Sequence, residues 1–319
     1  MKKNIKTAVI GVGSMGAHHA RVYSEISNLV AISDINEALG KQTADKYKVH
    51  YYKDYKEMLA MEKPDAVSVV VPTIYHKHVA IDCLNHKIPT LVEKPISNNA
   101  ADGRKIIKAA AENKTPLMVG HIERFNPAVL KLKQLIDRGK LGSILNLLAI
   151  RVGISPPKGK QLNVALELGI HDVDIFNFLT GETPVEKRID KLNISNTNIS
   201  DSSSITLRYK SSVGIIQTNW ITPIKIRRLY VTGIKGFIDL DYINQKLIFY
   251  DRVAGWESNE RIEDFSGLVS LSTVPTQVFI SKGEPLKLEL SFFLDNLSKS
   301  PILYKMTEDA INALEVLAD

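Results

Sequence analysis

The sequence contains only one cysteine, Cys83, among 319 residues. No disulfide can form within the chain, so a reducing compartment such as the cytoplasm suits it. No apolar run approaches the roughly 20 residues that a membrane-spanning helix needs. The short apolar stretch near the N-terminus is broken by Gly11 and Gly13, which indicates a buried first strand and not a secretory signal. We therefore expect a cytoplasmic protein with no membrane contact.

A large excess of one charge is also missing, because the net charge is +6 and the pI about 9.1. Nucleic-acid binding would require a dense basic run or a basic stripe with interleaved aromatic residues. The densest candidate, Lys225-Ile226-Arg227-Arg228, is short and lies in a strand-like segment. We expect no nucleic-acid partner. The mild excess of positive charge favours an acidic small molecule over a neutral one.

The histidines do not form the pattern of a metal site. His18 and His19 are adjacent, and adjacent side chains point apart on a helix. His76 and His78 are two residues apart and have no evident third ligand. We expect no bound metal.

The overall composition is typical of a globular protein, with 44% hydrophobic and 24% charged residues. The length of the chain predicts two domains. Over the first 120 residues or so, short apolar runs alternate with helical patterns. The predicted strands are residues 7–10, 29–33, 66–71, 90–92 and 117–119, and the predicted helices are 16–25, 36–47, 76–85 and 99–112. This alternation predicts a parallel sheet with right-handed crossovers.

The second half follows a different pattern. Helices are predicted over residues 127–138, 164–179 and 307–317, and strands over 205–209, 213–220, 228–231, 237–241 and 247–250. In the first of these strands apolar and polar residues alternate, which indicates an antiparallel sheet with one solvated or ligand-facing side. We predict an α/β domain at residues 1–122, followed at 123–319 by an α+β domain with an open, mainly antiparallel sheet for substrate binding and oligomerisation.

A glycine-rich turn joins the first predicted strand to the first helix: Gly11-Val12-Gly13-Ser14-Met15-Gly16. In a dinucleotide-binding turn the first glycine permits the tight bend, the second lets the backbone approach the pyrophosphate, and the third lets helix and strand pack closely. The N-terminus of the following helix offers N–H groups and a positive dipole end to the phosphates. The context of strand, turn and helix predicts a Rossmann domain.

Asp34 ends the second predicted strand, 18 residues after Gly16. A carboxylate near this spacing accepts hydrogen bonds from the ribose hydroxyls of the adenosine, and its charge repels a 2′-phosphate. No arginine follows directly, so we expect NAD rather than NADP as the cofactor. The alternative is a plain glycine-rich turn in which Asp34 caps the next helix.

Three further segments complete a recognisable set. Pro72-Thr73-Ile74-Tyr75-His76 follows the third predicted strand, Glu93-Lys94-Pro95 follows the fourth, and Glu167-Leu168-Gly169-Ile170-His171-Asp172-Val173-Asp174 lies in the helix of the second half. Together with the glycine turn, these segments resemble the Gfo/Idh/MocA oxidoreductases, in the expected order over nearly the whole chain. The resemblance implies a site between the second domain's sheet and the nicotinamide.

The resemblance also implies roles for individual residues. Lys94 and His171 match the family's catalytic lysine and histidine, and Glu167 stands where the family more often has an aspartate. The predicted cofactor contacts are Gly11, Gly13, Ser14, Met15, Gly16, Asp34, Pro72, Thr73, His76, Glu93 and Lys94. The predicted substrate contacts are Lys94, Arg124, Asn126, Arg151, His171 and Asp174.

Residues 120–127 and 151–157 narrow the choice of substrate. They resemble the corresponding segments of a subgroup that oxidises UDP-N-acetylglucosamine at its 3-hydroxyl. Arg151, Lys158 and Lys160 border a loop with Gly and Pro and are candidate donors to a diphosphate; Arg227 and Arg228 are another option, of which only one can face the ligand side of a strand. Inositol or a free sugar is the alternative substrate. A NAD-binding regulator without turnover is the alternative from another class. A homo-oligomer, dimer or tetramer, is expected.

The residues fit alcohol oxidation, which releases a hydride and a proton. A histidine is suited to take the proton near neutral pH. Glu167 and His171 are four residues apart, so on an α-helix they share a face and the carboxylate could orient the imidazole. Lys94 would stabilise the developing alkoxide. Taken singly, His171 could be a core histidine and Lys94 a surface lysine; the position of Lys94 after a buried strand favours the functional interpretation.

Overall fold

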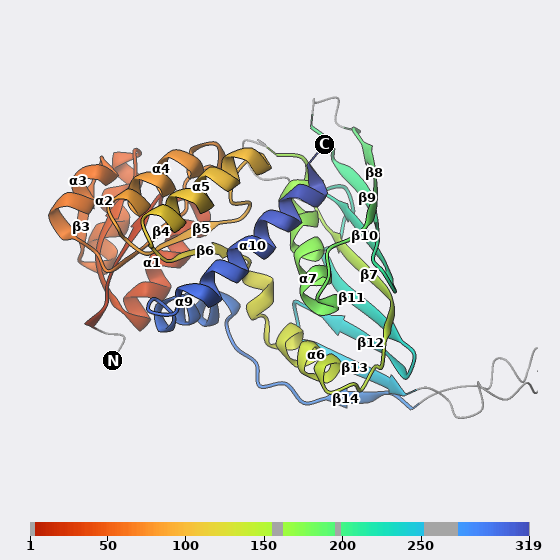
Figure 1. Cartoon of the computed structure of the whole chain (residues 1–319). Helices are drawn as coiled ribbons and strands as arrows, with labels where there is room; N and C mark the ends of the chain where they lie inside the picture. The colour runs from red at the N-terminus through yellow and green to blue at the C-terminus, as the bar shows by residue number, and fades with distance from the viewer. Residues whose placement is uncertain (1–3, 155–161, 195–198, 252–273, 319) are drawn as a thin grey trace, which may run out of the picture. The chain divides into compact units, whose positions relative to one another are not determined.

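The computed structural model describes residues 4–154, 162–194, 199–251 and 274–318 (Figure 1). The chain forms two compact units, one of residues 1–125 together with 283–319, and one of residues 126–282. In the described part no helix combines the length and the apolar character that crossing a membrane requires.

The first unit is built on a six-stranded parallel sheet with the order β3-β2-β1-β4-β5-β6. Its elements are β1 (Lys6–Ile10), α1 (Ser14–Ile26), β2 (Asn28–Ser33), α2 (Glu37–Tyr47), β3 (His50–Tyr52), α3 (Tyr55–Glu62), β4 (Ala66–Val69), α4 (Thr73–Asn85), β5 (Thr90–Glu93), α5 (Ala100–Glu112), β6 (Leu117–Gly120) and the 3₁₀ turn η2 (Ile122–Phe125). This strand order is that of a dinucleotide-binding Rossmann fold, with its switch point between β1 and β4.

The predicted strands and helices of this unit are confirmed. The central strands are buried on both faces, as their continuous apolar runs indicate, with Val9, Ile32 and Leu91 all fully buried. The pair β3 and α3 was not predicted. The strand has only three residues and lies at the sheet edge, where His50 is exposed and the two tyrosines are half-buried. A periodicity argument has too few residues to detect such a strand.

The C-terminal segment belongs to the first unit, whereas the sequence analysis placed it in the second domain. It contributes α9 (Pro285–Asp295) and α10 (Ser300–Leu317). The Thr307 hydroxyl donates to the Leu117 carbonyl of β6 at 2.8 Å, and buried Phe293 and Leu290 of α9 join the core of the Rossmann unit. Such long-range packing depends on apolar helix faces and leaves no local signal at the boundary.

The second unit is built on an eight-stranded sheet with the order β14-β13-β12-β11-β7-β10-β9-β8. Its elements are α6 (Pro127–Asp137), β7 (Ile144–Val152), the π-helical turn η3 (Ala165–Gly169), α7 (Ile170–Thr180), β8 (Glu186–Leu192), β9 (Ser202–Arg208), β10 (Val213–Asn219), β11 (Ile226–Gly233), β12 (Gly236–Asp241), β13 (Lys246–Asp251) and β14 (Thr276–Val278). Among the described strands of this sheet, only β7 and β10 pair in parallel, and every other pair is antiparallel. The predicted fold class, a parallel Rossmann sheet followed by an open, mainly antiparallel sheet, is confirmed.

The strand register separates the two faces of this sheet. Leu147 and Ala149 of β7 are fully buried on the face that α7 contacts, while Leu148 and Ile150 on the opposite face are half-buried. Arg227 pairs in register with Arg151, and Arg228 pairs with Ile150. Because cross-strand partners share a face, the two neighbouring arginines point to opposite sides, as strand alternation predicts.

The helix expected over residues 164–179 is present but contains a π-helical turn near its start. Glu167 lies in the π-helical turn η3, and His171 lies in the first turn of α7. A π-helical turn bonds residue i to i+5 and not to i+4, so the orientation of the imidazole by Glu167 stays a prediction. π-helical turns are frequent at functional sites, which leaves Glu167 in a distinctive backbone setting.

Candidate active site

The turn between β1 and α1 has the backbone that a dinucleotide pyrophosphate requires. Gly11 has a φ of +88°, and a Cβ there would lie 2.7 Å from the Val70 carbonyl oxygen. A Cβ on Gly16 would lie 1.9 Å from the Gly11 carbonyl oxygen, whereas a Cβ on Gly13 would meet nothing within 4 Å. Gly11 and Gly16 therefore serve the bend and the close packing, and Gly13 leaves the backbone accessible.

The N-terminus of α1 is suited to bind an anion. No side chain caps the helix at Gly13, and the first turn holds no acidic residue. By contrast, Asn36, Asp54 and Asn99 cap α2, α3 and α5 with their side chains. The helix whose N-terminus follows the glycine turn thus presents N–H groups that no side chain of its own competes for. Ser14 and Met15 are exposed beside it.

Asp34 lies at the carboxyl end of β2 and is tied to the same turn. Its Oδ2 accepts a hydrogen bond from the Val12 N–H at 2.7 Å, and its Oδ1 accepts one from the Asn36 N–H at 2.8 Å. The cap of α2 is Asn36, which removes the alternative that Asp34 is that cap. Each carboxylate oxygen retains a further lone pair for a ligand hydroxyl. The turn and Asp34 together fit an NAD whose ribose and pyrophosphate would lie along them.

The turn after β4 is fixed by a buried histidine. The ring of His76 lies between two carbonyl oxygens, with Nδ1 2.9 Å from that of Pro95 and Nε2 2.8 Å from that of Val71. Burial lowers the pKa of His76, against the opposing effect of these two carbonyls. Its predicted neighbours at the site, Pro72 and Thr73, are exposed and half-buried. The contacts of His76 shape the turn, so a role in holding the cofactor would act through Pro72 and Thr73.

Glu93 is the last residue of β5 and Lys94 follows it, at the same edge of the sheet. Glu93 is 8% exposed and its Oε1 lies 3.0 Å from Nε2 of His19 on α1. Its Oε2 accepts a hydrogen bond from the Lys94 N–H at 3.1 Å. Lys94 is half-buried and leads into Pro95 through a cis peptide bond. His19 was not predicted as part of this site. Its position on the first helix, three residues after Gly16, was the one sequence feature that placed it near the glycine turn.

In the second unit His171 is half-buried at the start of α7, while Asp172 and Asp174 are each 1% exposed. Asp172 receives two hydrogen bonds from Arg151, from Nε at 2.6 Å and from Nη2 at 2.9 Å. The guanidinium also lies 4.9 Å from the centre of the Tyr242 ring. Neither Asp172 nor Tyr242 was predicted as part of the site. A buried two-pronged ion pair behind His171 anchors α7 to β7.

Other predicted substrate contacts also form hydrogen bonds or ion pairs with residues of this chain. Arg124 is 5% exposed and pairs with Asp309 of α10 at 3.0 Å. Asn126 is 2% exposed; it caps α6 by accepting from the Ala128 N–H and donates to the Tyr242 carbonyl at 3.0 Å. Arg227 donates to the carbonyls of Val152 and Ile226. Lys158 and Lys160 lie outside the described residues.

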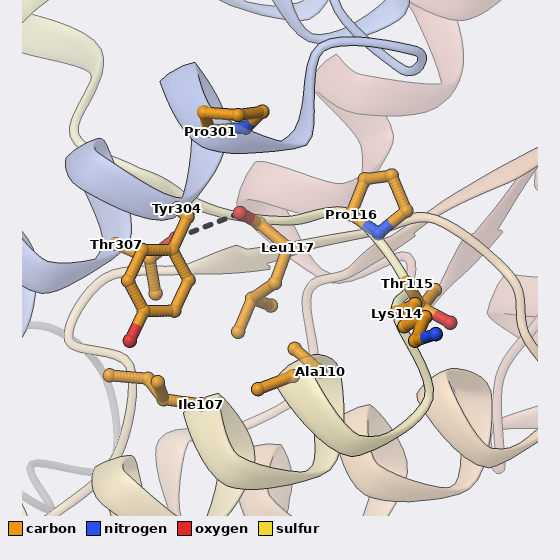
Figure 2. A pocket seen from close by; sticks show the side chains of 10 residues that line it. Ile107, Ala110, Lys114, Thr115, Pro116, Leu117, Pro301, Tyr304 and Thr307 are labelled. Carbon is orange, nitrogen blue, oxygen red and sulfur yellow. Dashed lines mark hydrogen bonds between the residues drawn. The ribbon is translucent and has the colours of Figure 1, made fainter.

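An apolar cavity of about 420 Å³ in the first unit is not part of this edge (Figure 2). Figure 2 shows it between α5, α10 and the start of β6, with Ala110, Leu117 and Tyr304 among the lining residues. Leu117 is the first residue of β6, so the cavity lies at the amino end of that strand. Ligands of open α/β sheets bind outside the carboxyl ends. Among the described residues, no cluster of His, Cys, Asp and Glu could hold a metal ion.

Comparison with known proteins agrees with this geometry. Residues 5–121 match the model of the oxidoreductase family with an NAD-binding Rossmann fold, and residues 129–239 match the C-terminal domain of the same Gfo/Idh/MocA group. This chain belongs to the Gfo/Idh/MocA family. It is accordingly an NAD-dependent oxidoreductase, which confirms the predicted cofactor and the activity that the resemblance implies.

Two curated proteins illustrate the range of relatives to which this chain is similar. The chain is 28% identical over 256 residues to UDP-N-acetylglucosamine 3-dehydrogenase of Acidithiobacillus ferrooxidans, covering 79% of each chain. The solved structure of that enzyme superposes with a TM-score of 0.85 over 98% of this chain and 96% of its own. The chain is 29% identical over 258 residues to myo-inositol 2-dehydrogenase of Thermotoga maritima, covering 76% of this chain and 77% of the relative.

A second solved structure, that of GenD2 from gentamicin A biosynthesis in complex with NAD, superposes with a TM-score of 0.81 at 19% identity, covering 99% of this chain and 92% of its own. At this identity the likeness concerns the fold.

Proposed function

We propose that this oxidoreductase oxidises a secondary hydroxyl of a sugar, and that its substrate is UDP-N-acetylglucosamine, oxidised at the 3-hydroxyl to the 3-keto sugar. The observation that carries the proposal is the likeness to UDP-N-acetylglucosamine 3-dehydrogenase over 98% of the chain. The retention of Lys94 after β5 and of His171 at the start of α7 supports catalysis as opposed to binding alone.

In the proposed reaction NAD, when bound, supplies the hydride acceptor. His171 takes the hydroxyl proton as a general base, since its ordinary pKa lies close to neutral pH. Lys94 places a positive charge beside the oxygen as its proton leaves, which stabilises the developing alkoxide. Glu167 supplies a carboxylate that can orient the imidazole, from the π-helical turn directly before α7. The proposal requires that Lys94 and His171 both reach the same hydroxyl.

Of the remaining predicted substrate contacts, Asp174 supports the proposal more than Arg124 and Arg151 do. Asp174 is a candidate acceptor for a sugar hydroxyl. Arg124 and Arg151 already pair with Asp309 and Asp172, so a diphosphate would have to compete with or share those carboxylates. This reduces the support for Arg151 as a diphosphate ligand and favours a structural role for it.

The first alternative is a polyol or free-sugar substrate handled by the same residues, which the 29% identity to a myo-inositol 2-dehydrogenase supports. The second is a regulator that binds NAD without turnover. It is supported by the change from the family's aspartate to Glu167 and opposed by the presence of both Lys94 and His171.

We further propose that the protein is a homo-oligomer in a reducing compartment such as the cytoplasm. The face of the second unit's sheet opposite α7 carries an aromatic row. Tyr230 stacks on Phe237 with ring centroids 5.9 Å apart, and Phe237 contacts Tyr250 at 5.7 Å. A row of half-buried aromatic side chains on an open sheet supports burial against another copy.

The experiment is to incubate the protein with NAD and a panel of nucleotide sugars, free sugars and polyols, and to follow NADH formation. Turnover with UDP-N-acetylglucosamine, with or without a ketone trap to draw the equilibrium, is the expected result. Turnover with inositol alone rejects the proposed substrate. NAD binding without turnover on any compound supports the regulator.

A further inference from the structure

A buried histidine on the phosphate-binding helix contacts the carboxylate that precedes Lys94. His19 lies in α1, three residues after Gly16, and is fully buried. Its Nε2 lies 3.0 Å from Oε1 of Glu93, whose side chain is only 10% exposed. The ring is also held edge-on against Tyr23, with ring centroids 6.5 Å apart. The pair thus joins the helix of the glycine turn to β5, the strand that ends at Glu93 directly before Lys94.

The second oxygen of the same carboxylate binds the Lys94 backbone. Oε2 of Glu93 accepts the Lys94 N–H at 3.1 Å. Gly120 at the end of β6 leaves room for this carboxylate, since a Cβ there would lie only 3.1 Å from Oε1. One oxygen of Glu93 thus faces His19, and the other accepts from the Lys94 peptide.

The hydrogen-bond pattern assigns the form of His19. Among the described residues Nδ1 of His19 is buried and has no hydrogen-bond partner, while Nε2 faces the carboxylate. A proton on Nε2 donates to Glu93, and a second proton on Nδ1 would meet no acceptor there. The network therefore places a proton on Nε2, from which the ring donates to Glu93.

We propose that His19 is a positioning residue for catalysis: by donating to Glu93 it fixes the carboxylate that orients the Lys94 backbone. The inference rests on the proposed function, because it takes Lys94 to be the group that contacts the reacting hydroxyl. His19 itself touches neither substrate nor the reacting atoms. Its effect is transmitted through one hydrogen bond to Glu93 and a second from the Lys94 N–H.

The competing explanation is that His19 only fills space in the core. The two explanations predict different activities for variants in which another side chain replaces the His19 ring. A glutamine places its amide nitrogen at nearly the same distance from the backbone as Nε2 and can donate, whereas a leucine fills similar space without a donor. A packing role predicts that leucine performs as well as glutamine, and a positioning role predicts that only glutamine restores the activity.

The test compares His19→Gln and His19→Leu with His18→Leu as the matched control, since His18 is the exposed neighbour on the same helix. For each variant kcat, KM for the best sugar substrate and Kd for NAD are measured, together with the melting temperature. We expect His19→Leu to lower kcat by about tenfold to hundredfold, the size of effect that small misplacements of catalytic groups produce. Kd for NAD should change by much less, His19→Gln should recover most of kcat, and the control should match the wild type.

A second measurement does not depend on turnover or on a known substrate. Histidine ring nitrogens are observed by ¹⁵N NMR in the wild type and in Glu93→Gln, and the His19 signals are identified by their loss in His19→Gln. We expect the wild-type ring to carry a proton on Nε2, and that signal to shift in Glu93→Gln. A wild-type ring protonated on Nδ1 alone would overturn the proposed hydrogen bond even if every variant folds.

Equal kcat for the leucine and glutamine variants, or a change confined to Kd for NAD, would likewise overturn the positioning role. These results are distinguishable from failure of the proposed function. If wild-type protein turns over no sugar or polyol, the proposed function fails while the tautomer measurement still decides whether His19 donates to Glu93.

Discussion

Arg151 of β7 and Asp172 of α7 form a buried ion pair with two parallel hydrogen bonds, at 2.6 and 2.9 Å, and the two side chains are 4% and 1% exposed. The Tyr242 hydroxyl adds a longer contact to Asp172 at 3.5 Å. Asp172 directly follows His171, so this pair fixes the helix that carries the proposed base. Arg151, which was a candidate diphosphate ligand in the sequence, therefore forms a structural ion pair within its own unit.

Removing one partner of this pair should destabilise the protein strongly. Arg151→Met leaves the Asp172 carboxylate buried without its main donor, and we expect unfolding to become easier by about 3–5 kcal/mol, measured by urea denaturation. The double variant Arg151→Met with Asp172→Leu should lose less than the sum of the single variants, because no buried charge remains. Near-normal stability of Arg151→Met, combined with a raised KM for a UDP-sugar alone, would restore the diphosphate role.

Replacing the proposed base should affect the chemical step far more than cofactor binding. We expect His171→Ala to lower kcat by about 10²–10⁴-fold, the range typical of general base catalysis, with little change in Kd for NAD. The matched control is His78→Ala on the exposed side of α4. Steady-state kinetics and NAD titration monitored by fluorescence provide both quantities. Unchanged turnover in His171→Ala would remove this residue from the mechanism.

The sequence was most informative where burial is continuous and local. The strands around Val9, Leu91 and Val119 are apolar runs bounded by helical patterns, so both the parallel sheet and the edge that carries Asp34 and Lys94 could be predicted. Glycine spacing located the phosphate turn because each glycine answers a local steric requirement. These features depend on neighbours within about 20 residues.

Features that depend on distant partners could not be predicted. Nothing near Thr307 indicates that its hydroxyl bonds the carbonyl of Leu117, 190 residues away. The role of Arg151 depends on Asp172, which the packing of α7 on β7 brings next to it. From the sequence alone, a solvated surface charge was an equally suitable interpretation of Arg151. The π-helical turn at Ala165–Gly169 has the same apolar character as an α-helix, so periodicity could not reveal it.

Asp34 should determine the choice between NAD and NADP. Asp34→Ala removes the acceptor for the ribose hydroxyls and also the repulsion of a 2′-phosphate, so Kd for NAD should rise more than Kd for NADP. Both constants are measured by calorimetry. Asp54→Ala, which removes the N-cap of α3, controls for the loss of a backbone-bonded carboxylate. An equal rise in both constants would count against the assignment of Asp34.

Glu93 should give the stability of the protein a distinct pH dependence. Burial by itself raises the pKa of this carboxyl, but the hydrogen bond from His19, the positive charges of His19 and Lys94, and the Lys94 N–H outweigh it, so that the pKa lies below the ordinary 4.5. A carboxyl whose pKa is lower in the folded state contributes stability that is present above the unfolded pKa and is lost as the pH falls through the folded value. The contribution should therefore be complete near neutral pH and should decline below about pH 4.5.

The matching measurement is the free energy of unfolding of the wild type and of Glu93→Gln in urea, over a series of buffers from neutral to acid. At neutral pH the variant should be less stable by about 1.5–3 kcal/mol, the worth of hydrogen bonds to a charged group. This difference should shrink below about pH 4.5, because the wild-type carboxyl is then protonated in the unfolded state while it still holds its charge in the folded state, and the loss is complete once the pH falls through the lower folded pKa. Glu112→Gln on the exposed surface of α5 serves as the control. A difference that stays constant down to acid pH would show that Glu93 is not ionised in the folded protein, and that His19 does not hold a carboxylate.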